Sequence, residues 1–153
     1  MNTQIKRLTY NVSYEVACAL RDKGYDEETN WYYHDEEEYH GDDTKEMVGD
    51  TAWPVWNSIL QYRIAAPLVA EVLDWLMSFG VVVYVFPNGK KWQYRVSVIS
   101  KKENATLPEY YLSSGDFSLW ESAMEEAILN ALDHVDEKEV RKRNIDPKRG
   151  GWC

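Results

Sequence analysis

The chain has 153 residues, a formal net charge of −9 and only two cysteines, Cys18 and Cys153. This length suits one globular domain that needs neither a disulfide framework nor a structural metal. The charge argues against a general nucleic-acid binder and against docking on anionic membranes, because both depend on Lys and Arg. The sequence shows no signal-peptide or transmembrane pattern, so we expect a cytoplasmic protein.

The first predicted helix covers residues 13–23. Ser13 is a favourable N-cap, Val16 and Leu20 lie on one apolar face, and Gly24 is a stop signal. Tyr25 is placed to pack back on the helix end, as in a Schellman motif.

An acidic segment follows this helix. Residues 26–50 contain eleven acids and one Lys, so this segment alone carries a charge of −10. Within it, residues 31–33 (Trp-Tyr-Tyr) predict a short edge strand. We expect residues 26–64 to form an acidic insertion between the first and second helices.

The second half of the chain predicts a helix, a three-stranded meander and a further helix. The residue ranges are 67–79 for the helix, 81–86, 91–100 and 109–112 for the strands, and 119–135 for the last helix. Asn88-Gly89 marks a hairpin, and the apolar run 81–86 is typical of a strand buried on both faces. Ser118 and Glu121 match a capping box.

The predicted fold class is therefore α+β, an antiparallel three-stranded sheet packed against helices. The order is helix, acidic loop, helix, three-strand meander, helix. Residues 1–135 are expected to form a single domain with the acidic insertion at about 26–64. Residues 136–153 are locally basic and lack periodicity, which predicts a flexible C-terminal tail.

Several stretches resemble small uncharacterised proteins encoded by phages and prophages of gut Bacteroidota. The matching residues are Val12–Ala17 with Leu20 and Gly24–Glu27, Ala66–Leu68 with Leu73–Leu76, and Glu121–Ala123 with Glu126, Ala127, Ala131 and Leu132. The resemblance implies a mobile-element origin in a bacterial host and transfers no activity. In topology alone, the order of elements is similar to double-stranded RNA-binding domains. Those domains grip phosphates with Lys at the start of their last helix, whereas residues 116–121 here include two acids and no Lys.

The acidic segment supplies the first candidate site. Its partner-binding candidates are Asp35, Glu36, Glu37, Glu38, Asp42 and Asp43. Carboxylates interleaved with aromatics can imitate a nucleic-acid strand and occupy a basic channel of another protein. His34 and His40 flank the same run and could ligate a divalent metal with its carboxylates, although the spacing matches no metal motif. The simplest interpretation of such a charge run is a solvated loop.

Two tryptophans held by a proline supply the second candidate site. Trp53 and Trp56 could stack on a base or another planar ligand, or they could close the end of a core under a long loop. The row Trp92/Tyr94 is expected to face the helices, with an exposed sheet face as the alternative. The sequence contains no nucleophile motif, phosphate loop or Cys-x-x-Cys pair.

We therefore expect a non-enzymatic protein-interaction or modulator protein of phage or prophage origin. It would be an antidefence or nucleic-acid-mimic factor that acts through the acidic segment. The expected partner is a host or phage protein, or a second copy of the chain, with no cofactor, membrane or nucleic acid. The alternatives are a small-ligand or nucleotide binder with an aromatic pocket, and a metal-dependent enzyme at the acidic loop. An exposed apolar or aromatic patch would favour the interaction protein.

Overall fold

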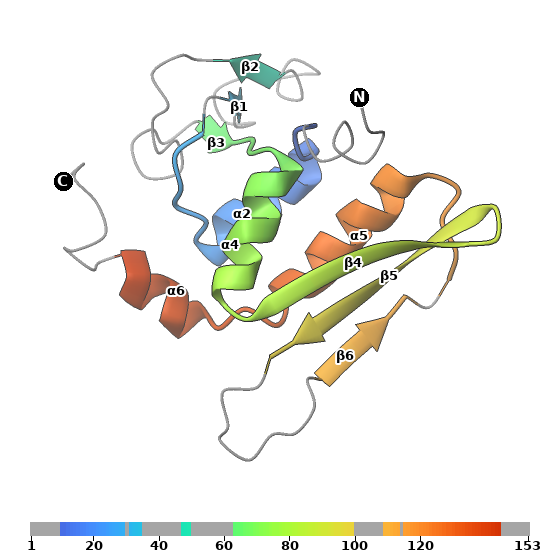
Figure 1. The fold of residues 1–153 in the computed structure, drawn as a ribbon. Coiled ribbons are helices and arrows are strands. Elements are labelled where there is room, and N and C mark those ends of the chain that lie inside the picture. Colours follow the sequence, from blue (N-terminus) through green and yellow to red (C-terminus); the bar gives the residue numbers. More distant parts are fainter. Residues whose placement is uncertain are drawn as a thin grey trace. The chain divides into compact units, whose positions relative to one another are not determined.

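The computed structural model describes residues 10–29, 31–34, 47–49, 63–99, 109–113 and 115–144. In these residues the chain forms helices and two antiparallel three-stranded sheets, which confirms the α+β class (Figure 1). No helix in this part of the chain is long and apolar enough to span a membrane.

Contacts along the chain separate it into two compact units. Unit 1 contains Met1–Tyr10 and Val69–Val135, and unit 2 contains Asn11–Leu68 and Asp136–Cys153. The expected single domain over residues 1–135 stays a prediction.

Unit 1 contains the predicted meander. Its elements are α4 (Val69–Ser78), β4 (Val81–Asn88), β5 (Lys91–Val98), β6 (Glu109–Leu112) and α5 (Trp120–Leu132), and its strand order is β4-β5-β6. Asn88 pairs with Lys91, so the hairpin loop is Gly89-Lys90, and Gly89 takes a positive φ of 64°. The Asn88-Gly89 signal therefore predicted the hairpin correctly. A glycine suits this loop because tight hairpin turns need positive φ.

The prediction that β4 is buried on both faces is wrong. β4 is an edge strand, and Tyr84 in its middle is 46% exposed, whereas Val81 at its start is fully buried. A continuous apolar run does not distinguish a central strand from an edge strand with one apolar face in solvent, because both lack polar residues.

The start of α5 also differs from its prediction. The N-cap is Leu119 rather than Ser118, and no side chain caps the helix. Phe117 and Trp92 exchange two backbone hydrogen bonds of 2.8 Å, which hold the chain beside β5 until just before the helix. This tertiary pairing, rather than the capping box, fixes where the helix begins.

Unit 2 begins with α2 (Tyr14–Lys23), which matches its prediction closely. The Ser13 hydroxyl accepts a hydrogen bond of 3.3 Å from the backbone N–H of Val16. At the other end Gly24 adopts φ 98° and Tyr25 donates its N–H to the carbonyl of Leu20 at 2.9 Å. Both caps use local sequence signals, which is why the boundaries could be predicted.

Unit 2 also contains a second sheet that the sequence analysis did not predict. It consists of β1 (Trp31–His34), β2 (Met47–Gly49) and β3 (Arg63–Ala65), in the order β2-β1-β3. β1 is therefore the central strand and not an edge strand. The Tyr33 hydroxyl donates a 2.7 Å hydrogen bond to the carbonyl of Val12, which ties β1 to the residues just before α2.

A further helix, α6 (Glu137–Asn144), lies in the segment predicted to be a flexible tail. Val140 is the buried residue of this helix and is 1% exposed. The side-chain amide of Asn144 donates a 3.0 Å hydrogen bond to the carbonyl of Gly24. The helix is polar at most positions, so its one buried contact gave no apolar period in the sequence.

Candidate functional site

Among the described residues of unit 1, no helix packs on the outer face of the sheet. The strand register places eight side chains together on this outer face, because directly opposite residues of antiparallel strands project to the same side. They are Val82, Tyr84 and Phe86 from β4, Gln93, Arg95 and Ser97 from β5, and Tyr110 and Leu112 from β6.

The inner face of the same sheet is packed against α5, which contacts both β4 and β5. Tyr94 and Val96 are buried there, as predicted for this row of β5. The side-chain amide of Asn130 lies 3.5 Å from the Tyr94 hydroxyl, and the His134 ring stacks on Tyr111 with centroids 4.2 Å apart. Among the described residues, α5 and the residues just after it therefore pack on the inner face.

The outer face carries exposed apolar side chains on β4 and β6, whereas Ser97 of the central strand is buried. Tyr110 is 62% exposed, Leu112 is 59% exposed, and Tyr84 on the far strand is 46% exposed. Exposed single apolar residues are ordinary on protein surfaces. Here they lie on β4 and β6, on either side of Arg95 of β5, and such a cluster is typical of an interaction site.

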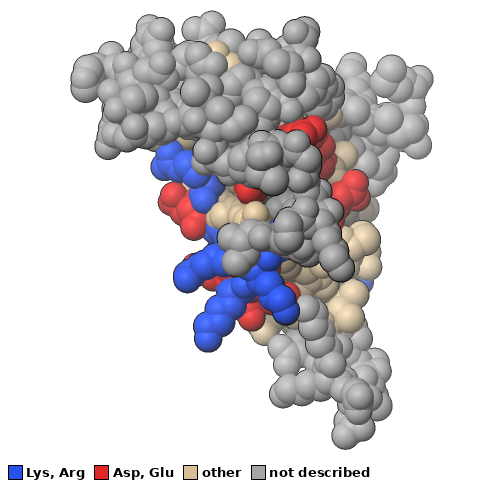
Figure 2. All heavy atoms as spheres, turned by 90° about the vertical axis from the view of Figure 1, so that its left-hand side faces the viewer, with Lys and Arg blue, Asp and Glu red and all other residues tan. Residues whose placement is uncertain are grey.

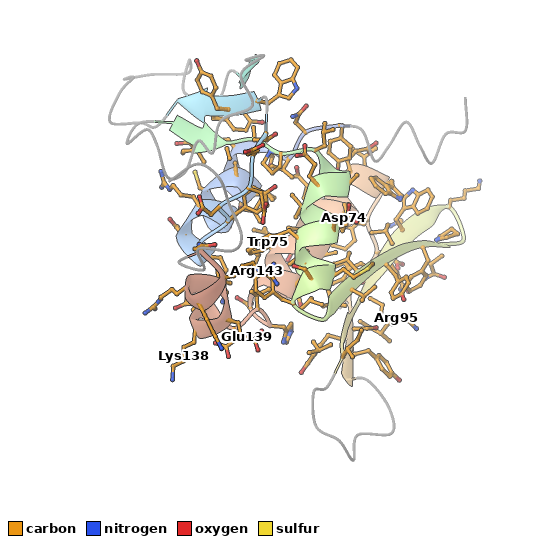
Figure 3. The ribbon with its side chains drawn as sticks, turned by 60° about the vertical axis from the view of Figure 1, so that its left-hand side comes forward. Asp74, Trp75, Arg95, Lys138, Glu139 and Arg143 are labelled. Carbon is orange, nitrogen blue, oxygen red and sulfur yellow. The ribbon has the colours of Figure 1, made fainter. Side chains whose placement is uncertain are left out.

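One cation lies at the centre of this outer face. The Arg95 guanidinium carbon lies 4.6 Å from the centre of the Tyr84 ring, and Arg95 is paired across the sheet with Tyr84 on one side and Leu112 on the other. Figure 3 shows Arg95 on the side of the sheet that faces away from α4. A guanidinium held over an aromatic face keeps its charge and its donors available to a partner.

The hairpin end of the outer face is polar and ordered by hydrogen bonds. The Asp116 carboxylate accepts a 2.7 Å bond from the side-chain amide of Gln93 and a 3.2 Å bond from that of Asn88. These contacts close one end of the apolar patch with satisfied polar groups. The arrangement matches the common anatomy of protein interfaces, which have an apolar centre and a polar rim.

A second charged surface lies on unit 2. Figure 2 shows Lys and Arg side chains gathered on this face with acidic side chains beside them. The carboxylate of Glu137 lies 3.4 Å from Arg141 and 3.9 Å from Lys23, so it partly neutralises two of these cations. The surface is therefore of mixed charge and offers less free positive charge than the basic composition of α6 suggests.

Most sequence-predicted site residues lie outside the described residues. This applies to Asp35, Glu36, Glu37, Glu38, Asp42, Asp43, His40, Trp53 and Trp56. His34 is the last residue of β1 and pairs with Arg63 of β3, but its side chain is not among those that the structure describes. Across the described residues no group of three or more His, Cys, Asp or Glu side chains could hold a metal ion. The acidic, metal and tryptophan hypotheses therefore stay predictions.

The outer face was not identified from the sequence, although part of its signal was present. Tyr110 and Leu112 are spaced by two, as are Val82, Tyr84 and Phe86, so each set shares one face of its strand. What the sequence lacked was the pairing between strands and the side that α5 covers.

Comparisons with known protein families, with curated proteins and with solved structures found no match to this chain. The outer face is therefore interpreted from its own residues.

Proposed function

We propose that this protein is a non-enzymatic interaction module that binds a protein partner through the outer face of the unit 1 sheet. The exposed patch of Tyr84, Tyr110 and Leu112 around Arg95 is the observation that supports this proposal. Tyr and Arg are the residue types over-represented at the energetic centres of interfaces, because they combine a large contact area with hydrogen-bonding capacity.

The chemistry of the patch indicates the kind of surface it would bind. Its apolar side chains require an apolar counterpart, and Arg95 requires a carboxylate or a backbone carbonyl once it is removed from water. The complementary partner is thus a protein surface with apolar side chains around one acidic residue.

A pair of matched variants tests the proposal. Tyr110→Ser with Leu112→Ser removes two large side chains from the outer face. Met77→Ser with Leu119→Ser removes two side chains that are 55% and 60% exposed elsewhere on unit 1. Each protein would be tagged and incubated with host lysate, and captured proteins would be quantified by mass spectrometry. Circular dichroism would confirm that both variants fold.

We expect a partner that the wild type and the Met77/Leu119 variant capture equally and that the outer-face variant captures at least tenfold less. Loss of two central contacts of about 1 kcal/mol each accounts for a change of this size. Equal capture by both variants would show that the outer face is not the binding surface.

The acidic segment supports a second candidate for how the protein acts. Its charge of −10 within residues 26–50 would suit a nucleic-acid mimic, and the resemblance to phage and prophage proteins would suit an antidefence factor in the cytoplasm of a bacterial host. Replacing Glu36, Glu37 and Glu38 by Gln should then weaken partner binding and reduce its salt dependence. Unchanged affinity would rule out the mimic while leaving the outer-face proposal standing.

A further inference from the structure

Among the described strands of unit 1, β4 forms one edge of the sheet, and it is exposed or half-buried from Val82 onward. It pairs with β5 on one side, and among the described residues no backbone hydrogen bond reaches it from the other side. An unpaired edge presents a row of N–H and C=O groups that can pair with another strand.

The register identifies which groups point outward. Ile99, which follows β5, donates its N–H to the carbonyl of Gly80 at 2.8 Å, so the backbone carbonyl of Gly80 points toward the β5 side. In an antiparallel strand each residue directs both its N–H and its C=O to the same side, and successive residues direct them to opposite sides. Val81, Val83, Val85 and Pro87 therefore direct their backbone groups away from the sheet.

One feature of this edge favours an incoming strand, and the one that opposes it lies near the end of β4. None of the eight residues of β4 carries a charge, whereas natural sheets commonly protect exposed edges with Lys or inward-pointing charges. Pro87, which has no N–H, is one of the outward-facing residues, so its missing donor interrupts only the last position of the edge. Val83 and Val85 keep both donor and acceptor.

We propose that β4 pairs with β4 of a second copy of this chain, antiparallel and centred on Tyr84. In this register Val83 lies opposite Val85 of the second copy, and these two residues exchange both backbone hydrogen bonds on each side of the centre. Val81 would lie opposite Pro87, but Val81 is fully buried and takes no part in the pairing. The N–H groups of Val83 and Val85, which are only half-buried, each find a carbonyl in this register.

The side chains are self-complementary in the same register. On the outer face Tyr84 lies opposite Tyr84, and Val82 lies opposite Phe86, so every cross-strand pair is apolar or aromatic. No like charges meet, which is the usual obstacle to self-pairing of an edge. A two-fold axis through Tyr84 closes the contact as an isologous dimer with one six-stranded sheet.

Site-specific disulfide formation tests both the pairing and its register. In a Cys18→Ser, Cys153→Ser background, Tyr84→Cys should form a covalent dimer on mild oxidation. Cα atoms of a non-hydrogen-bonded pair are about 4.5 Å apart, which a disulfide can span. Val82→Cys is the matched control, because two copies of residue 82 would be about 13 Å apart along the strands. Adding Phe86→Cys to Val82→Cys should restore the cross-link.

We expect at least tenfold more covalent dimer from Tyr84→Cys than from Val82→Cys. Equal cross-linking of the two single variants would overturn the register, and no cross-linking above that of the cysteine-free background would overturn the pairing.

Sedimentation equilibrium of the protein with its native cysteines reduced provides an independent measurement. Tyr84→Lys places two like charges opposite each other and should weaken dimerisation at least tenfold. Tyr110→Lys is the control, because Tyr110 lies on the same face but on β6, the strand farthest from the second copy. It should leave dimerisation unchanged. The proposal would also be overturned if the wild-type chain sediments as a monomer up to about 1 mM, because the Kd of the dimer would then be weaker than about 1 mM. Because Tyr110 and Leu112 lie on β6, the outer-face variant keeps the β4 edge, and either proposal can fail without the other.

Discussion

Replacing Gly24 by alanine should destabilise unit 2 for two separable reasons. Gly24 ends α2 with φ 98°, a conformation that L side chains rarely adopt. A Cβ at this position would also lie 2.9 Å from Cγ1 of Val140, the buried residue of α6. The first cost belongs to the helix end itself, and the second measures how closely α6 packs against it.

The two costs can be given magnitudes. A left-handed conformation costs a residue with a Cβ roughly 1–2 kcal/mol. Overpacking a close contact adds about 1–3 kcal/mol, and the lower half of that range applies here because one methyl group can shift. Gly24→Ala should therefore cost about 2–4 kcal/mol in the wild-type background. With Val140→Ala the contact disappears, and the same change should cost only about 1–2 kcal/mol.

Hydrogen exchange of the α2 amides in the wild type, the two single variants and the double variant would measure these free energies of opening. The coupling between Gly24→Ala and Val140→Ala should be at least about 1 kcal/mol, which exceeds the usual scatter of additivity. If Gly24→Ala costs the same in both backgrounds within about 0.5 kcal/mol, the reasoning on α6 packing is refuted.

Two further predictions concern single polar groups. Burial, and to a lesser extent the nearby charges of Glu125 and Glu121, raises the pKa of Tyr10 well above its ordinary value. The stability that the neutral form of Tyr10 contributes is therefore present below pH 10 and is lost as the pH rises above 10. The Tyr10 hydroxyl is buried and has no hydrogen-bond partner among the described residues, so Tyr10→Phe should be neutral or slightly stabilising at pH 7 and should reduce the alkaline loss of stability. Urea unfolding at pH 7 and pH 11 checks this, and an unchanged alkaline loss would contradict it. Asn144→Ala removes the hydrogen bond to the Gly24 carbonyl and should lower the stability of α6 by about 1 kcal/mol. Amide hydrogen exchange in α6 should then be faster, and unaltered exchange would show that the hydrogen bond contributes nothing.

The parts of the fold that the sequence predicted well depend on neighbours in the chain. Ser13 and Gly24 delimit α2 through bonds that reach no further than five residues, and the β4–β5 hairpin is marked by its own loop. Such local contacts are encoded in the residue types themselves, so reading caps and turns was sufficient.

The parts that it missed depend on distant residues. In the second sheet Trp31 pairs with Gly49, and Tyr33 pairs with Ile64 more than thirty residues later. Strands of three or four residues have too few positions for a period to emerge. α6 was missed because Val140 is its one buried side chain, and the face it packs on is supplied by α2.

The candidate site divides in the same way. The spacing of Tyr110 and Leu112 showed that they share one face of a strand, but not whether a helix would cover it. That depends on the position of α5 relative to the sheet, which the contact between Asn130 and Tyr94 reveals. An apolar strand residue is equally suited to a core and to an exposed patch, so its type alone cannot separate the two.

The discontinuous make-up of the two units has a consequence for synthesis of the chain. Unit 2 starts at Asn11, is interrupted at Leu68 by the whole meander, and resumes at Asp136. A ribosome therefore delivers every residue of unit 1 before it delivers α6 (Glu137–Asn144), so unit 2 is completed only after unit 1. Until then the Gly24 end of α2 lacks Val140, which lies beside it in the folded unit.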